Sequence, residues 1–183
     1  MKLVSIPDPV LSTQSKPVVN FDKKLHLIIQ QMIDVLEAQN DPPGVGLAAP
    51  QVGLSYQLFL IKPNKKDKVQ VFINPVIKSK LQIPNDKPNS NSKDSKKKDV
   101  RLEGCLSIPR IWGEVHRFPK IQIEYQDEKG NKKTEWFSGF KSVIVQHELD
   151  HLNGVLFTQR VLEQKGQLYE EKNDELVKIK DLI

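Results

Sequence analysis

Apolar residues along the chain recur at two spacings, one typical of helices and the other of strands. Between residues 25 and 36 they follow one another at intervals of three and four, which predicts an amphipathic helix with Asp22 as its N-cap. A second helix is predicted from about Ser142 to Gly154, and apolar residues cover most of its circumference. We therefore expect the second helix to be buried.

Strand periodicity marks four further segments. Residues 56–61 and 69–73 predict two strands joined by a polar turn, the second ending at Asn74-Pro75. Residues 121–125 alternate apolar and polar, and a Glu-Lys-Gly-Asn turn separates them from residues 134–137, which predicts an antiparallel hairpin. The two tryptophans are expected to pack in the core or at a sheet edge; they are Trp112 and Trp136.

Three segments lack a clear periodicity. Residues 1–20 carry apolar side chains among prolines and predict an extended arm on the surface. Residues 84–99 hold five lysines and three aspartates and predict a disordered low-complexity insertion. Residues 158–183 are dense in Glu and Lys and predict a charged C-terminal helix or tail. A chain of 183 residues needs no more than one domain, spanning residues 1–183.

The composition narrows the classes of protein to consider. The chain is 38% hydrophobic and 28% charged and has no apolar run of bilayer-spanning length, so we expect no membrane partner. The net charge is only +5, and the five lysines less three aspartates of residues 84–99 supply +2 of it, so direct nucleic-acid binding is not expected. Cys105 is the single cysteine, which excludes an intramolecular disulfide and suits a reducing compartment.

The second predicted helix contains the pattern His-Glu-x-x-His. Side chains at i and i+4 lie on one helical face, so His147 and His151 can reach one metal ion, with Glu148 beside a water bound to it. Imidazoles and carboxylates on a buried helix are costly to desolvate unless they pair or coordinate something. This favours a metal site over a chance match. His26 lies off the apolar face of the first helix and is expected to be solvated.

Cys105 is a candidate third ligand. A free cysteine is often only a small buried hydrophobe. Beside two histidines, however, a thiolate would leave the fourth tetrahedral position open, as catalytic metal sites do. The alternative is a closed structural site, for which His116 could supply the fourth ligand.

Residues 44–53 are small and apolar with one amide side chain, Gln51. Glycines allow close approach of another backbone, so this segment could offer main-chain groups to a peptide-like ligand. A tight structural turn is an equally simple explanation. A phosphate-binding loop is disfavoured because the Walker lysine is missing.

Together these segments resemble the motifs of the peptide deformylase family. They are residues 44–51 (GVGLAAPQ), 103–107 (EGCLS) and 146–151 (QHELDH), in the family's order. The similarity spans about residues 4–157 and is interrupted at residues 84–99. The resemblance implies an α+β fold, with antiparallel sheets packed around a central metal-binding helix, an N-terminal helix and a charged C-terminal helix or tail.

The implied reaction is hydrolysis of the N-formyl group from the formyl-methionine of newly synthesised polypeptides, with release of formate. Glu148 would take a proton from a metal-bound water, the nucleophile, and pass it to the leaving amine. Gln51 and the backbone N–H of Leu106 would donate to the formyl oxygen. The resemblance implies one divalent ion, natively Fe²⁺, for which Zn²⁺, Co²⁺ or Ni²⁺ could substitute during preparation. Its ligands would be Cys105, His147 and His151.

The resemblance also implies how the substrate peptide binds. Its backbone would pair like an added strand with Val45, Gly46 and Gly104. Four further residues are candidates for the wall of the methionine pocket: Glu103, Phe140, Val143 and Ile144.

Partners and location follow from the resemblance less directly. Arg117 is expected to pair with Asp150 and so to support the metal-binding helix. Formyl-methionyl nascent peptides are the expected partner, and contact with the ribosome would be transient at most, since the C-terminal segment carries both charge signs. Two locations are open, an organelle of bacterial origin reached with a leader and a bacterial cytoplasm. The oligomeric state is open as well.

Two alternatives from other classes remain at this stage. A zinc metalloprotease would need Glu163 or Glu170 as its third ligand, because no histidine follows His151. A metal-stabilised binding module would need His116 to close the site.

Overall fold

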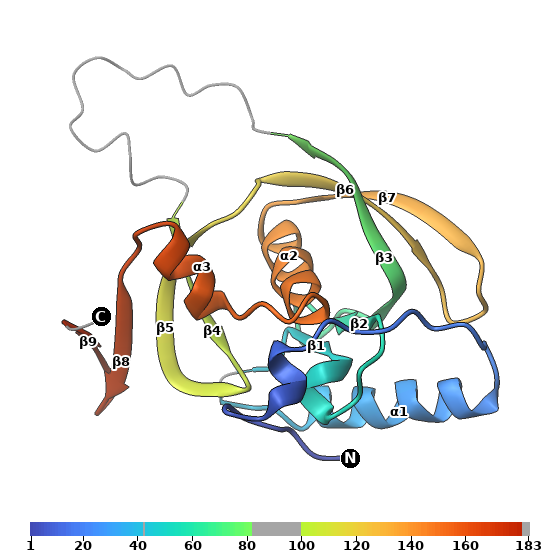
Figure 1. The fold of residues 1–183 in the computed structure, drawn as a ribbon, viewed down its shortest axis with the longest axis horizontal. Helices are drawn as coiled ribbons and strands as arrows, with labels where there is room; N and C mark the ends of the chain where they lie inside the picture. The colour runs from blue at the N-terminus through green and yellow to red at the C-terminus, as the bar shows by residue number, and fades with distance from the viewer. Residues whose placement is uncertain (42, 82–99, 181–183) are drawn as a thin grey trace.

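The computed structural model describes residues 1–41, 43–81 and 100–180, so the insertion predicted at residues 84–99 lies outside the described residues. Figure 1 shows helix α2 (Phe140–Leu152) at the centre of the molecule, with the strands of two sheets curving around it. The fold is thus a mixed one of antiparallel sheets and few helices, as expected. In the described ranges no helix is long and apolar enough to cross a membrane.

The larger sheet is antiparallel throughout. Its strands, in order across the sheet, are β1 (Gly46–Ala48), β2 (Leu58–Ile61), β3 (Gln70–Leu81), β6 (Lys120–Gln126) and β7 (Lys132–Ser138). The predicted strands in this region and the predicted hairpin are confirmed. In that hairpin Gln122 lies opposite Trp136, whose side chain is exposed on the edge strand β7.

Strand β3 is longer than predicted, because it does not end at Asn74-Pro75. The pairing of β3 with β6 shifts register between Ile73 and Val76, and Asn74 has a φ of 50°. The Asn74 amide accepts from the backbone N–H of Val18 and donates to its carbonyl, both at 2.8 Å. The proline therefore lies in a bulge, where its missing N–H does not interrupt the ladder.

The smaller sheet is also antiparallel. Its strands, in order, are β4 (Val100–Cys105), β5 (Ile108–His116), β8 (Leu168–Lys172) and β9 (Glu175–Lys178). A Cβ on Gly113 of β5 would overlap the side chain of Val161, so this glycine lets a helix lie directly on the strand.

The prediction of a charged helix or tail over residues 158–183 was wrong for most of that segment. As far as the structure describes the segment, to residue 180, only α3 (Phe157–Glu163) is helical, and β8 and β9 then form a hairpin. Its turn residues Asn173 and Asp174 have φ values of 50° and 63°, the conformation that two-residue hairpin turns require. The long charged side chains are solvated on this hairpin as readily as on a helix, so composition did not distinguish the two.

Two apolar clusters hold helix α2 and α1 (Lys23–Glu37) against the larger sheet. Ile144, Val145 and Leu149 of α2 pack with Phe59 and Phe72, whose stacked rings have centroids 4.6 Å apart. As predicted, the Asp22 side chain caps α1, accepting from the N–H of Leu25 at 3.0 Å. The apolar side chains thus fix α2 inside the molecule and leave its polar residues at set positions.

Candidate active site

Helix α2 begins slightly earlier than predicted and carries six of the candidate residues, both histidines among them. His147 and His151 lie one turn apart, with ring centroids 5.0 Å from each other. Cys105 ends strand β4, and its Sγ lies 3.2 Å from Nε2 of His151. The potential ligand atoms of the three residues all lie within 4.8 Å of one another. The fold therefore brings together the cysteine and both histidines although 42 residues separate Cys105 from His147.

The donor set fits a divalent transition metal. Burial raises the pKa of the Cys105 thiol, but the facing imidazoles outweigh this and hold it well below its usual range, which favours the thiolate. Among the described residues, Nδ1 of buried His151 and Oε2 of buried Glu148 have no hydrogen-bond partner. One thiolate and two imidazoles with a polar opening beside them match an open tetrahedral site. His116 is not part of this cluster, so the closed alternative receives no support from the described residues.

Glu148 is buried next to the cluster, with a relative exposure of 3%. Burial raises the pKa of its carboxyl to about 7, against the lowering effects of His147 and His151. A carboxyl with a pKa near the working pH can both accept and donate a proton. Gly46 lies so close that a Cβ there would overlap the Glu148 carboxylate and the side chain of Ile144. Only glycine leaves room for the carboxylate at this position of β1.

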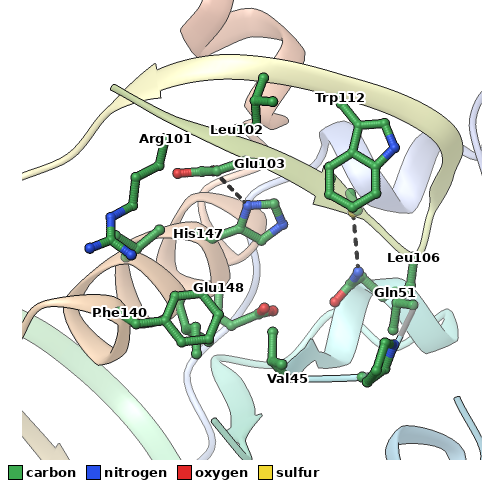
Figure 2. Close-up of a pocket in the computed structure, with 17 residues that line it drawn as sticks. Val45, Gln51, Arg101, Leu102, Glu103, Leu106, Trp112, Phe140, His147 and Glu148 are labelled. Atoms are coloured by element: carbon green, nitrogen blue, oxygen red, sulfur yellow. Dashed lines mark hydrogen bonds and ion pairs between the residues drawn. The ribbon is translucent and has the colours of Figure 1, made fainter. Parts of the chain in front are cut away.

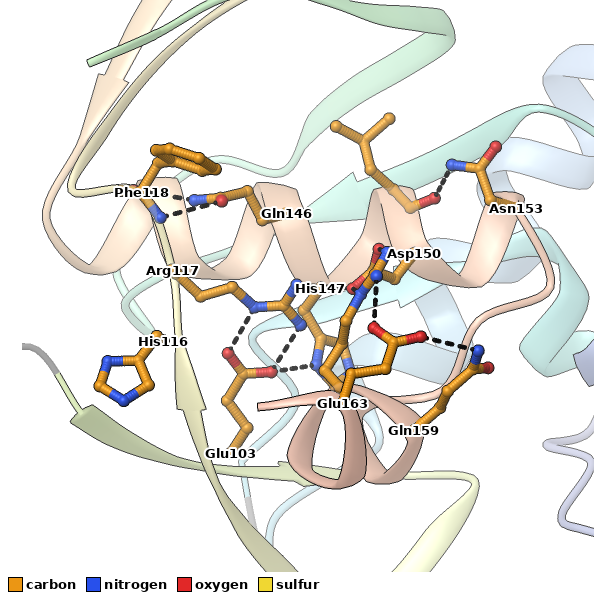
Figure 3. A network of polar contacts seen from close by, with 12 residues as sticks. Glu103, His116, Arg117, Phe118, Gln146, His147, Asp150, Asn153, Gln159 and Glu163 are labelled. Atoms are coloured by element: carbon orange, nitrogen blue, oxygen red, sulfur yellow. Dashed lines mark hydrogen bonds and ion pairs between the residues drawn. The ribbon is translucent and has the colours of Figure 1, made fainter. Parts of the chain in front are cut away.

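Glu103 holds His147 in place, a role that the sequence did not reveal (Figure 3). Its Oε2 lies 2.9 Å from Nδ1 of His147. Burial raises the pKa of Glu103, but hydrogen bonds and charge from Arg117 and His147 override this and lower it to about 2, so the group is ionised. An ionised carboxylate only accepts, so Nδ1 of His147 donates to it, and Nε2 is the ring nitrogen available to a metal.

Arg117 joins Glu103 to the metal-binding helix. It donates from Nε and Nη2 to the two oxygens of Glu103 at 2.8 and 2.9 Å, and from Nη1 to Asp150 at 2.5 Å. Asp150 also accepts from Arg160 of α3 at 2.7 Å. The predicted pairing of Arg117 with Asp150 is confirmed, and it belongs to a larger network that joins β4, the connection between β5 and β6, α2 and α3. Apart from their charge, nothing in the sequence pattern marked Glu103 or Arg160 as members of this network.

Gln51 reaches the cluster from the other side. It lies in the short 3-10 helix η2 (Ala49–Val52), where its Oε1 accepts from the N–H of Ala48 at 2.8 Å. This bond orients the amide so that Nε2 lies 3.4 Å from Sγ of Cys105 (Figure 2). Leu106 follows Cys105 at the rim of the same space. Two candidate donors thus lie beside the cysteine.

A pocket of about 480 Å³ opens beside the cluster, between the edge strands β1 and β4 (Figure 2). Every predicted site residue except the buried His151 lines it: Val45, Gly46, Gln51, Glu103, Gly104, Cys105, Leu106, Phe140, Val143, Ile144, His147 and Glu148. Edge strands present unpaired backbone groups, so a peptide can enter the pocket as an added strand.

Five lining residues are not among the predicted site residues, namely Pro43, Gly44, Arg101, Leu102 and Trp112. Trp112, predicted as core or edge packing, lies over Gly104, where a Cβ would come within 3.0 Å of its ring. Its indole donates to Glu171 at 2.7 Å. The face of a strand to which a tryptophan points depends on register, and the β4 and β5 register shifts between Gly104 and Cys105.

Comparison with known proteins agrees with this geometry. A family model described as Polypeptide deformylase matches residues 1–167. A peptide deformylase of Helicobacter pylori (strain Shi470) is 38% identical over 185 residues, covering 97% of this chain and 95% of the relative, and one of Desulfotalea psychrophila is 34% identical over 176 residues, covering 94% of each.

Solved structures of the same name superpose on the chain. The peptide deformylase of Thermotoga maritima has a TM-score of 0.72 at 36% identity, covering 86% of this chain and 95% of that one. The Plasmodium falciparum peptide deformylase in complex with an inhibitor has a TM-score of 0.71 at 34% identity, covering 89% and 92%. The chain therefore belongs to the peptide deformylase family, hydrolases that use a divalent metal to remove the formyl group from N-terminal methionine.

Proposed function

We propose that this protein hydrolyses the formyl group of formyl-methionyl nascent peptides, with Glu148 as the proton carrier. One divalent ion, natively Fe²⁺, would be bound by Cys105, His147 and His151. The observation that carries the proposal is the juxtaposition of an open Cys/His/His cluster with a buried carboxyl in a peptide-sized pocket. An ion held there supplies Lewis acidity and lowers the pKa of a water to near neutrality.

The protein's own groups account for the remaining steps. Glu148 takes a proton from the attacking water as its oxygen bonds to the formyl carbon. As the C–N bond breaks, the same carboxyl returns the proton to the amine nitrogen, and formate leaves. A pKa of about 7 suits both transfers at neutral pH.

Negative charge develops on the formyl oxygen during this attack. We assign its stabilisation to Nε2 of Gln51 and the backbone N–H of Leu106. Each such donor contributes about 3 kcal/mol in hydrolases where it has been removed. The Gln51 amide is held by Ala48 before substrate arrives, so it needs no reorientation on binding.

The pocket gives the substrate its register. The backbone of Val45, Gly46 and Gly104 at the two strand edges would pair with the peptide. The methionine side chain would then lie against apolar walls formed by Phe140, Val143 and Ile144, with the aliphatic part of Glu103 completing the wall.

The metalloprotease alternative lacks support. Glu163 pairs with Arg160 at 2.9 Å, and Glu170 pairs with Lys172 at 2.8 Å. Neither carboxylate belongs to the cluster that holds the histidines.

The test compares two reactions of protein loaded anaerobically with Fe²⁺. We expect release of formate from formyl-Met-Ala-Ser and no cleavage of internal peptide bonds. Glu148→Gln should keep its metal and lose about 10²- to 10⁴-fold in kcat, the usual contribution of general acid–base catalysis. Glu163→Gln is the matched control and should retain full activity. Full activity of the Glu148 variant would refute the assigned role.

A further inference from the structure

Helix α2 lines a second pocket with the face that the reaction does not use. This back pocket has a volume of about 540 Å³ and shares no lining residue with the active-site pocket. Three α2 residues and the residue that caps its C-terminal end, spaced by three or one, line it: Gln146, Leu149, Asp150 and Asn153. This spacing places them on one side of the helix, opposite His147 and Glu148.

The back pocket has an apolar wall. Val76 and Ile77 of the β3 bulge and Phe118 line it together with Leu149. Val76 is 53% exposed, which leaves an apolar surface open to a ligand. Val76 and Ile77 follow the bulge that accommodates Pro75.

The rest of the lining carries three cationic side chains. Arg117 pairs with Glu103 and Asp150, and Arg160 pairs with Asp150 and Glu163, so carboxylates already neutralise these two cations. The third cation, Lys80, lies with its Nζ 5.0 Å from the centroid of the Phe118 ring. A cation thus lies directly above the apolar wall.

We propose that the back pocket is a second binding site, which takes a small organic carboxylate with an aromatic or branched apolar body. The body packs on Val76 and Phe118, and the carboxylate accepts a charge-assisted hydrogen bond from Lys80. A neutral ligand of the same shape would leave the charge of Lys80 unmatched, and a cationic one would be repelled. An apolar carboxylate matches both the apolar side chains of the pocket and the positive charge of Lys80.

The probe is 2-naphthoate, titrated into the metal-loaded protein and followed by its fluorescence. We expect saturable binding that survives saturation of the active site with the product peptide Met-Ala-Ser. The neutral analogue 2-naphthamide should bind about tenfold more weakly, because it lacks the charge that Lys80 pairs with.

Substitutions in the back pocket test whether the probe binds there. Lys80→Gln should weaken binding about five- to tenfold, and Val76→Asp should abolish it by placing a carboxylate in the apolar wall. Lys78→Gln is the matched control, since it makes the same change in charge on the same strand, at a residue paired with Glu124 and outside the pocket. It should leave binding unchanged.

Three results would overturn the proposal: no binding at millimolar probe, displacement of the probe by Met-Ala-Ser, or equal affinities for the Lys80 and Lys78 variants. Binding is read without turnover, so this outcome is independent of the proposed reaction.

Discussion

Replacement of Glu103 by Gln tests whether a buried carboxylate positions a metal ligand. Glutamine keeps the shape but removes the charge that holds Nδ1 of His147 at 2.9 Å and two nitrogens of Arg117 at 2.8 and 2.9 Å. The Glu103 and Arg117 side chains are only 5% and 7% exposed, so solvent cannot replace the lost charge.

The size of the effect follows from these contacts. Removing one partner of a buried ion pair costs about 3 to 5 kcal/mol. Asp150 still neutralises Arg117 in the variant, so we expect the lower end, a loss of about 3 kcal/mol in the free energy of unfolding. A domain with about 5 to 15 kcal/mol of stability remains folded after such a loss. Metal affinity should fall about 10- to 100-fold, as it does when the carboxylate behind a ligating histidine is removed.

Two measurements separate the effects. Denaturant unfolding of metal-free protein reports the loss of stability, and competition with a chelator of known affinity reports metal binding. The control is Glu114→Gln on neighbouring β5, where the amide can still accept from Tyr169. If Glu103→Gln lost stability but kept its metal affinity within twofold, the carboxylate would be a structural group only, and our reasoning about His147 would be wrong.

Three further predictions concern the site and the core. Gly46→Ala should lower kcat/KM at least about 100-fold in the formate-release assay, because its Cβ displaces the Glu148 carboxylate; activity near that of the unchanged protein would contradict the close approach. Burial, together with the bond to Glu135 at 2.6 Å, raises the pKa of the Tyr125 phenol, so the folded state keeps a proton that the unfolded chain loses. The free energy of unfolding should therefore be unaffected by this group below about pH 10 and fall as the pH rises further, and Tyr125→Phe should abolish that fall in denaturant titrations. Chelation of the metal should lower the melting temperature by roughly 5 to 10 °C if the ion was present at about 100 times its dissociation constant, and calorimetric scans that coincide with and without chelator would argue against the metal site.

The sequence was sufficient for features that depend on local pattern. Helix α1, the hairpin of β6 and β7 and the buried character of α2 follow from periodicity and capping, and the structure agrees. The two histidines could be named because imidazoles on a buried helix are costly to desolvate without a partner, and Cys105 because a thiolate beside them leaves a fourth metal position open.

Features that depend on register and long-range pairing were not accessible. Strand β3 passes through Pro75 because the Asn74 side chain bonds to Val18, 56 residues away, and no local rule contains that contact. Strand β8 is placed by its pairing with β5, where Leu168 lies opposite Gly113. Trp112 lines the pocket opposite Gly104 of β4. In the first two cases the deciding partner is distant in sequence.

The buried charges around Arg117 also limit how the protein can change. The network that orients His147 forms a seam between the smaller sheet and two helices, since it joins β4 and the connection after β5 to α2 and α3. Replacing such a network by well-packed apolar residues often makes a protein more stable. Here the same replacement would remove the group that orients the His147 imidazole, so a gain in the free energy of unfolding would be accompanied by weaker metal binding. We expect stabilised variants of this protein to carry their substitutions elsewhere, away from this seam.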